Sequence, residues 1–256
     1  MHRRLALVRR PSPRLADGIV THIARSPFVD PDLALRQWEE YCAALRRRGW
    51  DLVEAPPVDD CPDGVFIEDQ VVVFGDLAVL CRSGSPERRA EQVGLRETLE
   101  QVGYRCIEIE EPGTLDGGDV LKWGRTVWVG SGGRSNDEGI AQLAQALSGF
   151  AVTVSPVPVT RALHLKSAVT ALPSGTIIGH EPTVDDPAQW ADFLPVPEEA
   201  GAHVVLLGGM SVLMSAAAPR TAHLLQGRGH DVVPVDISEF EKLEGCVTCL
   251  SVRLRG

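Results

Sequence analysis

The sequence predicts an α/β fold in which five ββαβ units form a closed propeller, and we expect residues 1–256 to make up one such domain. Hairpin patterns recur along the chain at a spacing of roughly 40–50 residues, a range typical of propeller-like arrays. Most hairpins are followed by a helical segment and a short strand. The first and last apolar runs are each incomplete, and pairing them would close the ring and hide both sheet edges.

The hairpins open the units. Each is a pair of apolar runs around a short turn that contains glycine. A doubly wound parallel sheet would instead need long single strands that alternate with helices, which disagrees with these pairs. The predicted pairs are 65–74 with 77–81, 119–123 with 126–130, 165–172 with 176–179, and 202–207 with 210–215.

Helical segments and short apolar runs complete the units. Run 5–9 has no hairpin of its own, and run 247–254 has no second strand after it, so we expect these two runs to pair. The apolar spacing predicts helices at 31–48, 86–102, 137–147 and 219–227, followed by strands at 50–53, 104–109, 151–154 and 231–235.

The composition narrows the classes of function. A formal net charge of −10 argues against binding to nucleic acid or to an anionic membrane surface, and it suits a cationic small molecule. No apolar run is long enough for a signal peptide core or a membrane span, so we expect a cytoplasmic protein. Six cysteines in 256 residues do not indicate a disulfide scaffold.

Residues with catalytic chemistry recur at one position in the repeat, the start of the first strand. Glu68 and Asp69 lie within an apolar run, where at least one carboxylate is expected to be buried and to need a cationic partner. Asp116 precedes Gly117-Gly118, which is also how an ordinary turn looks, and His164 equally fits a hydrogen-bonded core histidine. Together with Cys249, these residues would converge on the propeller axis and form a site.

Cys246 and Cys249 form a C-x-x-C motif. Redox motifs of this type normally open a helix, whereas we expect this one to run into a strand, and no second C-x-x-C supplies further zinc ligands. The glycine-rich stretch 130–134 lacks the lysine-serine ending of a phosphate loop and is interpreted as a loop that carries Arg134. A redox or zinc role is therefore disfavoured, and taken by itself Cys249 fits either a small buried thiol or the nucleophile of this constellation.

Four segments resemble one enzyme family over nearly the whole chain. Segments 63–69, 114–121, 163–167 and 241–251 are similar, in the same order, to the dimethylarginine dimethylaminohydrolases. This family belongs with arginine deiminase to the guanidine-modifying superfamily, whose fold is a five-bladed α/β propeller. The resemblance implies hydrolysis of Nω-methylated arginines to citrulline and a methylamine. It implies no metal and no organic cofactor.

The resemblance also implies roles for ten residues. Cys249 matches the nucleophile, His164 the general acid/base and Asp116 the carboxylate that accompanies the histidine. The remaining residues match substrate-binding positions: Asp69 for the guanidinium, with Glu68 beside it; Arg82 and Arg134 for the α-carboxylate; and Asp63, with the backbone carbonyls of Leu15 and Leu243, for the α-ammonium group.

Two other functions remain open at this point. A deiminase of the same superfamily would act on free arginine or a related guanidine. A binding protein for cationic amino acids would have lost catalysis, which the presence of Cys249, His164 and Asp116 argues against. The sequence does not predict an oligomeric state.

Overall fold

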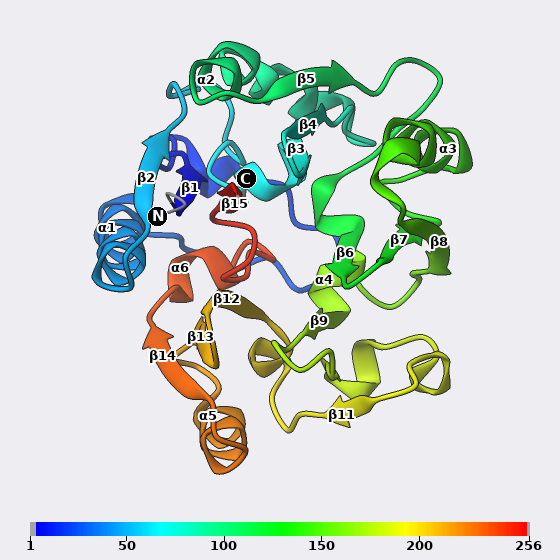
Figure 1. Cartoon of the computed structure of the whole chain (residues 1–256). Coiled ribbons are helices and arrows are strands. Elements are labelled where there is room, and N and C mark those ends of the chain that lie inside the picture. Colours follow the sequence, from blue (N-terminus) through cyan, green and yellow to red (C-terminus); the bar gives the residue numbers. More distant parts are fainter. Residues whose placement is uncertain (1–3, 255–256) are drawn as a thin grey trace.

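The computed structural model describes residues 4–254, in which five small three-stranded sheets surround a central axis (Figure 1). The sheet orders are β15-β1-β2, β3-β4-β5, β6-β7-β8, β9-β10-β11 and β12-β13-β14. In every sheet, the first two strands of this order pair antiparallel and the last two pair parallel. This arrangement confirms the predicted propeller of ββαβ units.

The strands are short, from three to six residues each. They are β1 Leu5–Val8, β2 Asp51–Glu54, β3 Val71–Phe74, β4 Leu77–Leu80, β5 Arg105–Glu108, β6 Val120–Trp123, β7 Thr126–Ser131, β8 Thr153–Pro158, β9 Val169–Ala171, β10 Ile177–Gly179, β11 Phe193–Pro195, β12 Val204–Gly208, β13 Ser211–Ser215, β14 Asp231–Val235 and β15 Val252–Leu254.

Helices connect the middle strand to the last strand in four of the sheets. In the fourth sheet, 3-10 turns at Glu181–Thr183 and Pro187–Gln189 replace the helix. Two further helices are single turns near the axis, α4 Leu165–Ala168 and α6 Ser238–Glu241. The connecting helices are α1 Pro31–Arg47, α2 Leu95–Gln101, α3 Asp137–Ala146 and α5 Pro219–Gly227.

Local chemistry explains where the helices begin and end. The Asp30 side chain caps α1 by accepting hydrogen bonds from two backbone N–H groups of the first turn, and Pro31 occupies the first helical position. The predicted helix 86–102 is interrupted instead. A 3-10 helix covers Pro86–Gln92, and α2 starts only after Gly94, whose φ of +73° lies in the left-handed region that favours glycine.

The ring closes as the sequence predicts. β15 pairs antiparallel with β1 in the register Leu5↔Leu254 and Leu7↔Val252, and β1 continues the sheet by pairing parallel with β2. The first and last described parts of the chain therefore share one sheet. Apolar clusters fill the space between neighbouring sheets; one of them joins Leu7 of β1 to Leu80 of β4 and Leu99 of α2.

The strands at the axis start later than predicted, and this is a correction. Short helical turns precede three of them: Ile67–Gln70 before β3, Gly117–Asp119 before β6, and α4 before β9. Residues 246–250 also form turns, and only Val252–Leu254 is a strand. The C-x-x-C motif thus lies in a turn, so the strand argument against its redox chemistry was wrong.

No helix within residues 4–254 is long and apolar enough to cross a membrane.

Candidate active site

The turns that precede the innermost strands bring four predicted residues together at one end of the axis. Asp69 precedes β3, Asp116 precedes β6, His164 precedes β9 and Cys249 precedes β15. All four side chains are buried, none more than 6% exposed. Three of them border a small cavity of about 20 Å³, namely Asp69, His164 and Cys249. Equivalent positions in four sheets therefore meet, as the repeat predicts.

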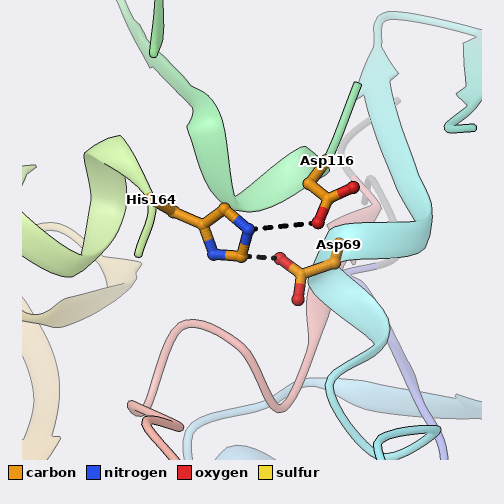
Figure 2. A group of neighbouring side chains, drawn as sticks. All are labelled: Asp69, Asp116 and His164. Carbon is orange, nitrogen blue, oxygen red and sulfur yellow. Dashed lines mark hydrogen bonds and ion pairs between the residues drawn. The ribbon is translucent and has the colours of Figure 1, made fainter. Parts of the chain in front are cut away.

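His164 lies between two carboxylates (Figure 2). Its Nε2 is 3.1 Å from Oδ2 of Asp116, and its Nδ1 is 3.8 Å from Oδ1 of Asp69. Burial alone would lower the pKa of His164, but the charge of Asp69 and the hydrogen bond to Asp116 outweigh it and raise the pKa to about 9. The imidazole is therefore charged at neutral pH and can donate a proton.

Two adjacent glycines allow the carboxylates to approach the histidine. A Cβ on Gly118 would lie 2.5 Å from Oδ1 of Asp69 and 2.7 Å from Nδ1 of His164. A Cβ on Gly117 would lie 2.0 Å from the carbonyl oxygen of Glu68. The pair Gly117-Gly118 is required by close packing at the site, so the motif is more than an ordinary turn.

Asp69 is held by an arginine that the sequence analysis missed. Nη1 of Arg88 donates to Oδ2 of Asp69 at 2.6 Å, and the backbone N–H of Gly118 donates to Oδ1 at 3.0 Å. Arg88 also binds Glu91 through two nitrogens, at 2.9 and 2.8 Å. Although burial opposes it, the charges of His164 and Arg88 lower the pKa of Asp69. Asp69 is thus an ionised carboxylate beside Cys249.

The signal of Arg88 in the sequence was ambiguous. Arg88 and Glu91 are three residues apart in a segment that predicted an ordinary amphipathic helix, where such pairs are usually on the surface. This pair is buried because the 3-10 helix that carries it packs near the axis. The local sequence pattern does not predict that packing.

Arg134 borders the cavity, whereas Arg82 does not. Nη1 of Arg134 is buried, makes no hydrogen bond and lies 3.9 Å from Oδ2 of Asp116, so it can still bind an anion. The guanidinium of Arg82 contacts the carbonyl of Gly113 at 3.1 Å and Glu111 at 3.2 Å. Arg88 and Arg134 are thus the arginines that line this cavity, and the substrate-binding role of Arg82 stays a prediction.

The site predicted to bind the α-ammonium group of the substrate is only partly formed. Asp63 and Leu243 border the cavity. The carboxylate of Asp63 accepts from the backbone N–H of Ile19 at 3.1 and 3.3 Å, and Ile19 lines the cavity itself. Leu15 does not line it, and its carbonyl accepts from the N–H of Gly18 at 3.0 Å. The chain enters the cavity about one turn after Leu15, at Ile19.

Glu68 points away from its neighbour Asp69. Its Oε1 binds Nζ of Lys166 at 2.7 Å and Nη2 of Arg253 at 3.4 Å. These three residues line a separate cavity of about 150 Å³. The structure therefore does not bring Glu68 to the side chains around Cys249.

The nucleophile candidate has a thiol neighbour. Sγ of Cys249 lies 3.2 Å from Sγ of Cys246, which also contacts Oγ1 of Thr248 at 3.2 Å. The hydrogen bond between the two thiols and the burial of the Cys249 sulfur raise the pKa of Cys249, and the charges of Asp69 and Glu68 act in the same direction. Before a cationic substrate binds, Cys249 is a thiol.

Within residues 4–254, the only group of three or more side chains with metal-ligand chemistry and spacing is Asp69, Asp116 and His164, whose ligand atoms lie within 4.8 Å of one another. These atoms already engage one another, Arg88 and the backbone of Gly118. The arrangement fits proton transfer and the binding of a guanidinium.

Comparison with known proteins decides the family. No family model matches the chain. A dimethylarginine dimethylaminohydrolase of Streptomyces coelicolor is 59% identical over 250 residues, which cover 98% of this chain and 96% of the relative. The chain belongs to the dimethylarginine dimethylaminohydrolase family. A second member, from Pseudomonas aeruginosa, is 31% identical over 96% of this chain and 98% of its own length.

Solved structures of this family share the fold. A Pseudomonas aeruginosa dimethylarginine dimethylaminohydrolase with a cysteine replaced by serine, in complex with citrulline, matches with a TM-score of 0.91 and 30% identity over 99% of this chain and 100% of its own. A dimethylarginine dimethylaminohydrolase with a histidine replaced by glycine, in an adduct with S-methyl-L-thiocitrulline, matches with a TM-score of 0.90 and 29% identity over 99% and 100%. The N-terminal domain of a cyanobacterial arginine dihydrolase, at 22% identity over 98% of this chain and 97% of its own, with a TM-score of 0.85, shares the fold.

Proposed function

We propose that this chain hydrolyses Nω-methylated arginines to citrulline and a methylamine through a covalent thiouronium on Cys249. The chain is a hydrolase of the dimethylarginine dimethylaminohydrolase family, which acts on C–N bonds of linear amidines. The observation that carries the proposal is the cavity in which a thiol, an ionised carboxylate and a charged imidazole meet: Cys249, Asp69 and His164.

The substrate is a cationic amino acid, and each of its charged groups has a candidate partner in the cavity. Asp69, fixed by Arg88, would bind the guanidinium opposite Cys249. Arg134 has an unused buried donor for the α-carboxylate. Asp63 and the carbonyl of Leu243 would bind the α-ammonium group. The segment around Ile19 would complete this binding site in place of Leu15.

The first half of the reaction forms the thiouronium. The bound cation stabilises the thiolate of Cys249, whose proton passes to solvent, and the sulfur attacks the guanidinium carbon. His164 then transfers its proton to the nitrogen of the methylamine, and the C–N bond breaks. Asp116 keeps the imidazole in place through its bond to Nε2. The products are a neutral methylamine, a neutral imidazole and a cationic S–C(NH₂)(NHR) adduct.

The second half consumes one water molecule. Neutral His164 takes a proton from the water as its oxygen attacks the adduct carbon. The C–S bond breaks and citrulline leaves, while the hydroxyl proton of the adduct passes to the sulfur and restores the thiol of Cys249; His164 keeps the proton taken from water and is again charged. The raised pKa of His164, about 9, suits the first step, because the imidazole starts out charged.

The cavity must enlarge to admit a substrate. A volume of about 20 Å³ is far smaller than an arginine derivative. Part of its wall is formed by Ile19, Glu244 and Gly245, and the carboxylate of Glu244 accepts hydrogen bonds from the backbone N–H groups of segment 21–23. We expect this segment to move when substrate enters.

A substrate panel tests the function. The purified chain is incubated with asymmetric dimethylarginine, monomethylarginine, free arginine and a simple guanidine, and citrulline and the released amine are measured. We expect citrulline from the methylated substrates at the highest kcat/KM. A higher kcat/KM with arginine would establish a deiminase instead, and binding without citrulline would indicate a binding protein.

We also propose a cytoplasmic location. The six cysteines are all free, which suits a reducing compartment. Cell fractionation with an antibody to the chain tests this proposal.

A further inference from the structure

The C-x-x-C motif has a geometry that the proposed hydrolysis does not use. Cys246 and Cys249 lie on one turn, closed by a hydrogen bond from the N–H of Cys249 to the carbonyl of Cys246 at 3.1 Å. Their sulfur atoms are 3.2 Å apart, about 1 Å more than a disulfide bond. A small rotation of either side chain would bring them to bonding distance.

The two sulfur atoms border different cavities. Cys249 borders the catalytic cavity of about 20 Å³, whereas Cys246 borders a cavity of about 490 Å³ between the fourth and fifth sheets. Leu163, Glu244 and Gly245 line both cavities and lie between them. Cys246 therefore lies on the side of the larger cavity, although it is only 5% exposed.

We propose that Cys246 and Cys249 form a modification site, at which a hydroperoxide converts the two thiols to an intramolecular disulfide that a thiol reductant reopens. This inference rests on the proposed function. The disulfide would stop hydrolysis, because Sγ of Cys249 could no longer attack the substrate.

Oxidation takes two balanced steps. The thiolate of Cys246 attacks one oxygen of the hydroperoxide, the O–O bond breaks, and Cys246 becomes a sulfenic acid while hydroxide leaves. The sulfur of Cys249 then displaces water from the sulfenic acid and forms the S–S bond. Two thiols lose two electrons, and the peroxide becomes two molecules of water.

The surroundings favour Cys246 as the first sulfur to react. The hydrogen bond from Cys249 lowers the pKa of Cys246, although burial opposes it, and His203 and the hydroxyl of Thr248 act in the same direction as Cys249. The larger cavity also gives a small dithiol access to Cys246 of the disulfide. Attack there would release Cys249 as the leaving thiolate and restore the nucleophile.

One tryptic peptide reports the modification. Cleavage after Lys242 and Arg253 gives peptide 243–253, which holds both cysteines. The chain is treated with a few equivalents of hydrogen peroxide, alkylated, digested and analysed by mass spectrometry. We expect this peptide to escape alkylation and to weigh about 2 Da less than its reduced form, for the loss of two hydrogen atoms. Free thiols counted in denaturant should fall by two from six.

Variants separate the pair from the other cysteines. Cys246→Ser, or Cys246→Ala if the serine variant folds poorly, should give no disulfide, and Cys249 should then be recovered either alkylated or in an oxidised form that dithiothreitol does not reverse. Cys106→Ser is the matched control, because Cys106 is half-buried and donates only to the carbonyl of Arg96, and it should retain the reversible disulfide.

The result that overturns the inference is a wild-type peptide that carries sulfinic acid or two alkylated cysteines after peroxide treatment. The mass measurement does not depend on turnover. A chain that forms the disulfide but makes no citrulline when reduced would refute the proposed function and leave the modification site intact.

Discussion

The two ends of the propeller axis are built from the same segments of chain but differ in chemistry. Asp69 and His164 face the catalytic cavity, while Glu68 and Lys166, one and two residues away, line the cavity at the opposite end. Cys249 and Arg253 divide in the same way. The segments before β3 and β9 thus each supply one residue to each end, and sequence proximity does not distinguish a catalytic residue from a structural one.

The balance of charge distinguishes the ends. At the opposite end, Glu68 is met by two cations, Lys166 and Arg253, so its charge is more than neutralised. At the catalytic end, three cations, His164, Arg88 and Arg134, lie among five carboxylates: Asp63, Asp69, Glu91, Asp116, and Asp119, whose pKa is raised to about 6 by burial. The catalytic end is prepared for an additional cation and the opposite end is not.

The largest difference in activity between variants of the two ends is expected for Cys249 and Arg253. Cys249→Ser should lower citrulline formation by at least about 10³-fold, because serine lacks the thiolate needed for attack. Arg253→Lys keeps a cation beside Glu68 and should change kcat/KM by only a few-fold. Both variants are assayed with dimethylarginine. If Cys246→Ser were inactive and Cys249→Ser active, the assignment within the motif would be reversed.

The neighbouring carboxylates offer the sharpest matched pair. Asp69→Asn keeps the size of the side chain but removes the charge that would hold the guanidinium, and it should lower kcat/KM by about 10²–10³-fold, since the loss of a buried charge pair costs roughly 3–4 kcal/mol. Glu68→Gln should mainly lower the free energy of unfolding, by on the order of 2 kcal/mol, because it leaves Lys166 and Arg253 without a counter-ion. Comparable losses of kcat/KM in both variants would contradict the assignment of Asp69 to substrate binding and of Glu68 to stability.

The sequence predicted the closed ring and the convergence of Asp69, Asp116, His164 and Cys249 because both follow from the repeat. The repeat alone left open which of Glu68 and Asp69 enters the cavity, because it assigned both to a strand and they lie in a 3-10 turn. The family resemblance selected Asp69 for the guanidinium.

The missed residues have a different physical origin. Arg88 belongs to a segment between strands whose path over the site is set by packing, and its pattern with Glu91 is that of a surface pair. The segment after Leu15 has neither strand nor helix periodicity, so the entry of Ile19 into the cavity left no mark in the sequence.

The two predicted carboxylate-binding arginines can be separated by substrate. Arg134→Ala should raise KM for dimethylarginine by about 10–100-fold, because a charge-assisted bond to the α-carboxylate is worth roughly 1.5–3 kcal/mol. It should have little effect on a guanidine that lacks the carboxylate. Arg82→Ala, which removes contacts to Gly113 and Glu111, should leave both substrates within about two-fold. A selective KM effect of Arg82→Ala would restore the original assignment.

Stability at alkaline pH should depend on the catalytic end. The folded-state pKa of His164, about 9, exceeds its unfolded value near 6.5, so its contribution is fully present below pH 6.5 and is lost as pH rises through 9. The loss amounts to about 3 kcal/mol. Urea unfolding at pH 6 and pH 9.5 should show this decline, and His164→Asn should reduce it. An equal decline in the variant would assign it to other groups.

The smallest expected effect concerns His164 and the free thiol. The pKa of Cys249 is raised by the hydrogen bond to Cys246, by burial and by nearby carboxylates, although the charged His164 borders the same cavity. We therefore expect His164→Gly to leave the ultraviolet thiolate titration of the free enzyme nearly unchanged while it blocks departure of the amine. Cys246→Ser should shift the same titration, because it replaces the sulfur that shares the hydrogen bond. A large rise in the thiol pKa of His164→Gly would mean that the imidazolium and the thiolate form an ion pair at rest. The catalytic end would then be neutralised from within, like the end that holds Glu68, and would not await a cation.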